Sequence, residues 1–175
     1  NDGTNNGAIS SSDRFGNLNA YDFDGVDDYI TTSLNGPTGG SARTLSYWAK
    51  RYNTGTETQY TSFTGGSNLF SCGEAFRTGF EYSGAYIGVN CSKIVYEAII
   101  DTNWHMYSYV VPNLADVTLE DINIYQDGVL LSTIDNFATN GVTQTLNTGT
   151  GINLTFAYSS SSYFESLDVK LGLSF

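Results

Sequence analysis

The sequence predicts an all-β protein in which two antiparallel sheets pack face to face. Thirteen Tyr and ten Phe among 175 residues supply side chains that favour strands, and only two Pro interrupt the chain. Short runs alternate apolar and polar side chains, as a half-buried strand does. Gly, Ser and Asn separate these runs, which predicts tight polar turns between strands. The length fits one domain over residues 1–175.

A loose lead-in with at most one short strand is expected before residue 20. The stretch AYDFDGVDDYI that follows predicts a strand, a turn and a second strand. Gly25 permits a positive φ at the turn, and Asp24, Asp27 and Asp28 crowd around the same bend. Such crowding is repulsive unless a cation or a hydrogen-bond donor balances it. The turn is therefore either a solvated acidic loop or part of a calcium site, since Ca²⁺ prefers oxygen ligands.

The middle of the chain predicts a series of short strands separated by glycines. They are expected at residues 29–33, 43–52, 60–63, 69–72, 79–82, 86–89 and 93–100. The second of these, RTLSYWAKRY, alternates with the period of a strand. One of its faces is apolar and includes Tyr47, while the other carries Ser46, Trp48 and Lys50. We expect the second face to be the wetter one.

The second half of the chain continues the same pattern. Strands are expected at residues 103–111, 122–126, 129–134, 152–158 and 167–173. Asp127 and Gly128 separate the second and third of these strands, and both residue types tolerate the positive φ of a tight hairpin turn. This pair is the strongest hairpin signal in the sequence.

Five phrases of the sequence together resemble a known family. They are AYDFDGVDDYI, LSYWAK, the Trp104-His105 pair, INIYQDGVLLS and SLDVKLG. Each is similar to a signature of laminin-G-like domains of the concanavalin A-like lectin and glucanase superfamily, and they follow the family order. The resemblance implies a jelly roll of two antiparallel sheets. The chain departs from the family between residues 53 and 93 and at Ser166, where glycine is expected, so ligand specificity does not follow from the resemblance.

The same resemblance implies a structural calcium ion that ties the beginning of the chain to its last strand. It places Asp168 of SLDVKLG in the ligand set, together with Asp24 and the Gly25 carbonyl of the acidic turn. A net charge of −11 is compatible with a bound divalent cation. The alternative is that Asp168 simply faces solvent, as alternation alone would place it.

Cys72 and Cys91 are the only cysteines, and a disulfide between them is the expected state. It would imply an oxidising compartment; the alternative is two free, buried thiols in an intracellular protein. A zinc site is not expected from two cysteines without a Cys-X-X-Cys pair and a single histidine.

The carboxylates do not follow the pattern of a glycoside hydrolase, which remains the least favoured function. Jelly-roll glycosidases need an acid and a nucleophile about 5 Å apart, alternating along one strand. Glu81 and Glu97 are each isolated in sequence, and His105 has no nucleophile partner in view. We therefore expect no enzyme activity. His105 is otherwise a histidine that is hydrogen-bonded within or beside a sheet.

Ligand binding is the favoured function, because a sheet face with aromatic and polar groups can stack on sugar rings. Trp48 with Lys50 is the first candidate, although a core tryptophan is the alternative. His105, Tyr107 and Tyr109 share one face of their strand and are expected to line a concave binding surface. Trp104, which lies on the opposite face of that strand, is expected in the core.

Charge and composition limit the partners. Seven Lys and Arg against eighteen Asp and Glu argue against nucleic acid and against an anionic membrane surface. No apolar run is long enough for membrane insertion. The expected partners are glycans or surface glycoproteins, bound by an extracellular or cell- or virion-surface lectin or adhesion module. The alternative is a self-associating structural subunit of a surface filament, viral tail or capsid.

Overall fold

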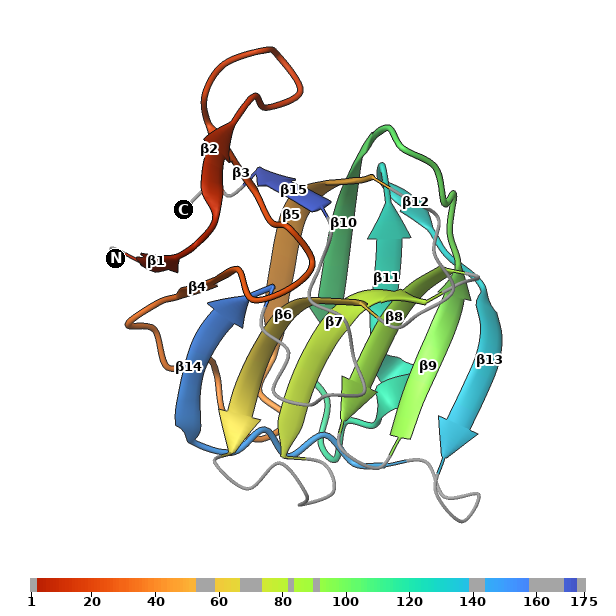
Figure 1. The fold of residues 1–175 in the computed structure, drawn as a ribbon. Coiled ribbons are helices and arrows are strands. Elements are labelled where there is room, and N and C mark those ends of the chain that lie inside the picture. The colour runs from red at the N-terminus through yellow and green to blue at the C-terminus, as the bar shows by residue number, and fades with distance from the viewer. Residues whose placement is uncertain are drawn as a thin grey trace.

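The computed structural model describes residues 3–52, 59–66, 74–81, 84–89, 92–138, 144–157 and 169–172. Two sheets lie face to face, and every strand pair in these ranges is antiparallel (Figure 1). The prediction of an all-β antiparallel sandwich is confirmed.

The first sheet has eight strands. Their order is β1 (Thr4–Asn6), β4 (Tyr29–Thr31), β14 (Gly151–Phe156), β6 (Gln59–Gly66), β7 (Ala75–Glu81), β8 (Gly84–Val89), β9 (Ser92–Glu97) and β13 (Thr133–Ala138). Consecutive strands β6 to β9 form a meander, which is the arrangement that glycine-spaced hairpins predict.

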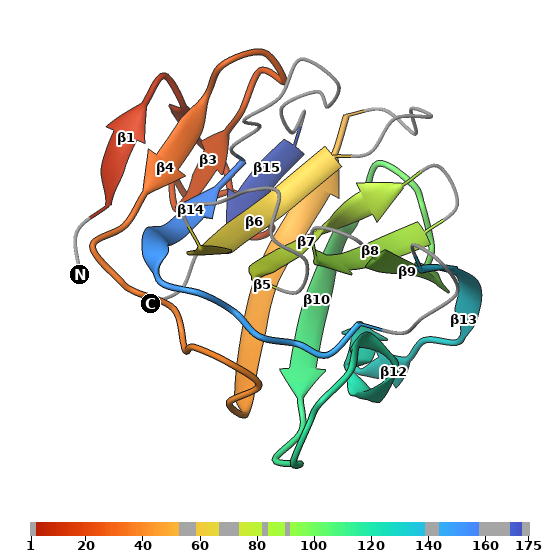
Figure 2. The ribbon, with the colours of Figure 1, turned by 90° about the horizontal axis from the view of Figure 1, so that it is seen from below.

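The second sheet has seven strands, and Figure 2 shows it as a separate layer beneath the first. Their order is β12 (Val129–Leu130), β11 (Asn123–Gln126), β10 (Trp104–Val111), β5 (Arg43–Arg51), β15 (Val169–Gly172), β3 (Ala20–Asp22) and β2 (Ile9–Ser11). A short 3-10 helix, η1 (Leu119–Asp121), follows β10. The lead-in contains two short strands, β1 and β2, where at most one was expected.

The Asp-Gly turn between β11 and β12 forms as the sequence predicts. Asp127 and Gly128 have φ angles of 52° and 82°, and the two strands pair on either side of them. The strand expected at residues 69–72 lies outside the described residues, as do Cys72, Cys91 and Asp168. The disulfide and the role of Asp168 therefore remain predictions.

Some glycines of the meander lie inside its strands. The strands predicted at 79–82 and 86–89 overlap β7 and β8, but both begin earlier than predicted, at Ala75 and Gly84, and they contain Gly79 and Gly88. Gly88 is required because the phenol ring of Tyr86 crosses it: a Cβ at this position would lie 2.6 Å from the ring carbon Cζ. The glycine makes room for a buried ring next to it in the same strand.

The core lies between the two sheets. Its fully buried side chains come from both layers and include Phe23, Phe80, Ile87, Ile94, Tyr109, Leu119, Ile122, Ile124 and Leu146. Removing one such side chain from water contributes about 1.5–3 kcal/mol. Buried tyrosines in this core keep hydrogen-bond partners, since the Tyr47 hydroxyl donates to the Tyr109 hydroxyl at 3.1 Å.

The inner and outer faces of β10 are the reverse of the prediction. Tyr107 and Tyr109 point into the core with 2% and 0% of their surface exposed, so they cannot line an exposed binding surface. Both hydroxyls find partners there: Tyr107 accepts from Gln126 Nε2 at 3.0 Å, and Tyr109 donates to a backbone carbonyl at 3.3 Å. Trp104, expected in the core, lies half-buried on the outer face.

Candidate functional site

The outer face of the seven-stranded sheet carries the aromatic side chains that a ligand can reach. Trp48 of β5 lies opposite Met106 of β10, and Trp104 lies opposite Lys50. Residues that are directly opposite in an antiparallel pair share one face of the sheet. All four are half-buried, whereas the alternate residues of β5 from Tyr47 onward are buried beneath them. Trp48 and Lys50 therefore face outward, as expected.

The same face continues onto β11. Tyr125 lies opposite Ser108, which in turn lies opposite Ser46. The Ser46 hydroxyl donates to the Ser108 hydroxyl at 2.9 Å, so hydroxyl groups stand beside the aromatic rings. We call Trp48, Trp104, Met106 and Tyr125 the aromatic face.

One ring of the aromatic face is covered by an arginine. The loop between β2 and β3, residues 12–19, projects from the sandwich (Figure 1). Its Arg14 guanidinium lies 3.9 Å from the centroid of the Trp48 ring and 4.1 Å from that of Phe15. Such cation–π contacts are worth about 0.5–1 kcal/mol at exposed sites. A ligand that stacks on this side of Trp48 must displace the guanidinium.

Asp13 fixes the shape of that loop. Its Oδ1 accepts hydrogen bonds from the backbone N–H groups of Phe15 at 2.8 Å and Asn17 at 2.9 Å, and its Oδ2 accepts from the Asn19 side chain at 3.3 Å. Burial alone would raise the pKa of this carboxyl, but the hydrogen bonds from Phe15, Asn17 and Asn19 together outweigh it and lower the pKa. The loop is thus held by an ionised aspartate.

His105 does not offer a free nitrogen to a ligand. Nδ1 lies 2.6 Å from Asp127 Oδ2, and Nε2 lies 3.0 Å from Asp101 Oδ1. The ring is largely covered and stands edge-on to Tyr107, with 6.4 Å between ring centroids. The prediction that His105 lines a concave ligand surface is therefore wrong, and the alternative of a hydrogen-bonded histidine beside the sheet is the one observed.

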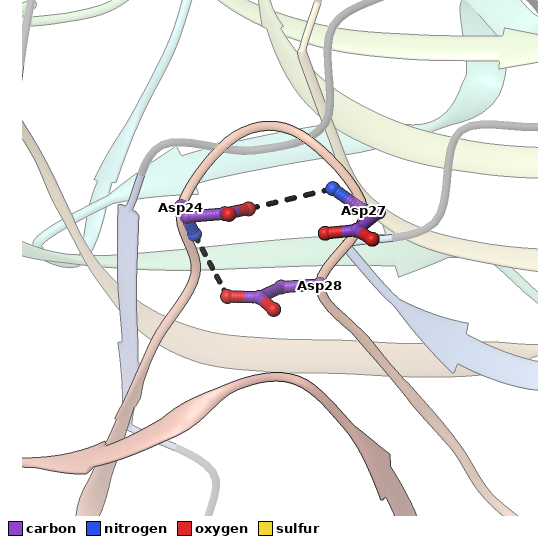
Figure 3. A group of neighbouring side chains, drawn as sticks. All are labelled: Asp24, Asp27 and Asp28. Carbon is purple, nitrogen blue, oxygen red and sulfur yellow. Dashed lines mark hydrogen bonds between the residues drawn. The ribbon is translucent and has the colours of Figure 1, made fainter.

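Three carboxylates meet in the turn between β3 and β4. Oxygen atoms of Asp24, Asp27 and Asp28 all lie within 4.8 Å of one another, and Figure 3 shows them converging inside the bend. Asp24 Oδ1 accepts from the backbone N–H of Val26 at 2.8 Å and of Asp27 at 3.4 Å, while Asp28 Oδ2 accepts from the Asp24 N–H at 3.0 Å. Gly25 has φ 78°.

Asp28 is the buried member of this group, with 7% of its surface exposed, and Asp24 and Asp27 are exposed. Gly7 lies against Asp28 so closely that a Cβ there would collide with Oδ1. The three side chains can each offer an oxygen to a hard cation. The last strand is near: β15, which begins one residue after Asp168, pairs with β3, which ends two residues before Asp24.

Glu81 and Glu97, isolated in sequence, lie on one face of the eight-stranded sheet, because both are in register with Gly84 of β8. Glu81 is 2% exposed and forms an ion pair with Lys93. Glu97 is exposed and accepts from the Ser132 hydroxyl at 3.3 Å. A buried, paired carboxylate and a solvated one two strands away differ from the closely spaced acid and nucleophile of a retaining glycosidase.

Two features of this region escaped the sequence analysis. Arg14 gives no local signal, since its contact with Trp48 joins residues that are distant in sequence. The His105 contacts do leave a trace, because Asp101 is four residues before His105 and Asp127 occupies the predicted hairpin turn. Pairing the strands in antiparallel register would have placed Trp104 beside Lys50.

No protein-family model and no curated protein matches the chain. Among solved structures, domains LG4-5 of the mouse laminin alpha1 chain match with a TM-score of 0.60 at 11% identity, over 88% of this chain and 40% of that chain. A mutant of HCR/D matches with a TM-score of 0.49 at 11% identity, over 98% of this chain and 42% of that one. The laminin match shows a laminin-G-like β-sandwich fold, in a chain that spans two fifths of the matched laminin structure.

The described residues contain no helix with the length and apolar character needed to cross a membrane.

Proposed function

We propose that the protein is a non-catalytic recognition module that binds glycans or surface glycoproteins through the aromatic face. The observation that carries this proposal is the outward placement of Trp48 and Trp104 on adjacent strands. Flat aromatic rings pack against the C–H faces of sugars, and the Ser46 hydroxyl and Lys50 amine can bond sugar hydroxyls. The laminin-G-like fold supports a binding module over an enzyme. We place it in an extracellular or surface setting.

A calcium ion is the proposed cofactor, and its role is structural. The turn of Asp24, Asp27 and Asp28 gathers three carboxylates within 4.8 Å, and a cation would add to the balance of charge that the backbone N–H donors of Asp24, Val26 and Asp27 already provide. Asp168 and the Gly25 carbonyl are the remaining proposed ligands, and the pairing of β15 with β3 supports a link between the two ends of the chain.

Glycan binding is tested by array screening, followed by titration of the best ligand against two variants. We expect Trp48→Ala and Trp104→Ala each to weaken binding about tenfold, because an aromatic contact of about 1.4 kcal/mol is lost. Thr44→Ala is the matched control, since Thr44 is exposed on the same face at its far end. A reducing-sugar assay on the same ligand should show no release.

Two results would contradict this proposal. Unchanged affinity in both Trp variants would mean that the glycan binds elsewhere. Release of reducing ends that Glu81→Gln or Glu97→Gln abolishes would make the protein an enzyme.

An assembly subunit is the second candidate, and one edge of the sandwich favours it. The edge strands β12 and β13 and the segment after β9 expose Ile99, Val129, Leu130 and Ile134, which are between 49% and 66% exposed. Exposed aliphatic groups beside edge strands suit pairing with another chain. Concentration-dependent association on sizing, with no glycan bound on the array, would favour this function.

A further inference from the structure

His105 contacts two connections that lie at one end of the seven-stranded sheet. Asp101 belongs to the connection between β9 and β10, and Asp127 belongs to the turn between β11 and β12. The imidazole stands between their carboxylates, with N···O distances of 3.0 Å and 2.6 Å. Each of its two ring nitrogens therefore faces an acceptor oxygen.

Only a protonated ring can make both contacts. A neutral imidazole carries one N–H, and an ionised carboxylate has no proton to donate, so one nitrogen lone pair would then face an oxygen lone pair. The imidazolium has two N–H groups and makes two charge-assisted hydrogen bonds. The geometry thus depends on the proton.

The two carboxylates are not held equally. Asp127 makes two further hydrogen bonds to β10. Its Oδ1 accepts from the Met106 N–H at 2.9 Å, and its own N–H donates to the Met106 carbonyl at 2.8 Å. Among the described residues, Asp101 is otherwise bonded within its own connection, to the backbone and side chain of Asn103 at 2.7 and 2.8 Å. Loss of the proton therefore releases Asp101 first.

Ile99, which precedes residues 100–103, stays bonded to the sheet whether or not His105 is protonated. The Gln126 side chain accepts from the Ile99 N–H at 2.7 Å and donates to the Ile99 carbonyl at 2.8 Å, and neither contact involves a titrating group. We propose that Asp101, His105 and Asp127 form a pH-dependent latch that fastens residues 100–103 to the sheet end when His105 is protonated and frees them when it is neutral.

The other charged and titratable groups near the ring do not replace the latch. Tyr107, its neighbour on β10, has a raised pKa because it is buried, and it stays neutral. Arg51 of β5 is the cation that interacts with Tyr107, and Lys50 lies on the opposite face of the sheet. Of the carboxylates in the described part of the chain, Asp101 and Asp127 pair with the imidazole.

The pKa shifts of His105 and Asp101 give the direction of the pH dependence. Burial alone lowers the His105 pKa, but the hydrogen bonds to Asp127 and Asp101 outweigh it and raise the pKa above its usual 6.5. A raised pKa means that the latch is fully present below pH 6.5 and is lost as the pH rises through the folded value. Hydrogen bonds from Asn103, and then from His105, lower the Asp101 pKa below 3.8, so the acceptor stays ionised throughout.

The test is an NMR titration of the intact protein without any ligand, so it can fail independently of glycan binding. The chain has one histidine, so the imidazole signals need no assignment by mutation. We expect a midpoint above 6.5, with the amide signals of Asp101 and Asn103 moving at the same midpoint. The protection factor of the Asn103 amide, which is its exchange rate corrected for the intrinsic pH dependence, should fall at least tenfold above it, while the protection factor of the Ile99 amide should not change.

Asp101→Asn should lower the midpoint of the His105 titration and remove the pH-dependent change in the Asn103 amide. Asp116→Asn, an exposed change of the same charge, should leave both unchanged. A midpoint at or below 6.5, an Asn103 amide that does not titrate, or equal shifts in the two variants would overturn the latch.

Discussion

Gly88 shows how a single atom determines the packing of the eight-stranded sheet. The Tyr86 ring that crosses it is only 4% exposed, so the ring cannot swing into solvent to admit a Cβ. We expect Gly88→Ala to lower the free energy of unfolding by about 1–3 kcal/mol, the usual cost of overpacking a core.

Denaturant unfolding measures this cost, and Gly40→Ala is the control. A Cβ at Gly40 would make contacts of 3.4 Å or more with its neighbours, so that change should cost far less. Equal stabilities of the two variants would show that Tyr86 moves aside.

At the residue scale, alternation identifies strands but does not always tell the inner face from the outer. On β10 both sets of alternate residues are bulky, with Trp104 and Met106 on one side and Tyr107 and Tyr109 on the other. Which face is buried depends on partners from other strands, such as Gln126 of the paired strand β11 for Tyr107. The outward placement of Trp48 agrees with its polar neighbours Ser46 and Lys50 on the same side of β5, which favoured it over a core position.

The loop between β2 and β3 is an element whose order depends on one carboxylate. Asp13 has a lowered pKa, so its contribution is present above 3.8 and is lost as the pH falls through the folded value. We expect Asp13→Ala to raise the rate of proteolysis within residues 12–19 and to change Trp48 fluorescence, because Arg14 leaves the indole ring.

Arg14→Gln is the companion variant for this loop. It should change Trp48 fluorescence in the same way but leave proteolysis slow, since the Asp13 hydrogen bonds remain. Fast proteolysis in Arg14→Gln would mean that the stack, rather than Asp13, orders the loop.

At the element scale, the sequence predicts best where local chemistry is decisive. The Asp127-Gly128 hairpin follows from φ preferences alone, and β5 follows from its alternation. The meander of β7 to β9 was only partly predictable. A glycine inside a strand, which makes room for a neighbouring ring, cannot be distinguished by sequence from a glycine in a turn. Five sequence phrases in family order predicted the sandwich, and the acidic turn was also predictable. The contact of Arg14 with Trp48 was not, because the two residues are distant in sequence.

For the whole molecule, the net charge of −11 makes a bound cation stabilising. We expect calcium to raise the midpoint of thermal unfolding, by an amount equivalent to about 2.7 kcal/mol at a free concentration one hundred times the Kd. Asp24→Asn and Asp168→Ala should each remove most of this shift, and a chelator should reverse it in the unmodified protein.

Asp116→Asn serves as the control, because it removes one exposed charge elsewhere in the chain. If calcium does not move the midpoint, or moves it equally in Asp168→Ala, the proposed ion site is wrong.

The position of β15 determines when the molecule can be completed during synthesis. This strand, residues 169–172, lies between β5 and β3, so β3 and β2 reach the rest of their sheet only through it. A nascent chain can form the β5–β10 and β10–β11 pairs early, yet its first strands must wait beside an open edge until residue 172 has left the ribosome. Strands β2 and β3 are therefore the last part of this sheet to be secured, although they are made before its other strands.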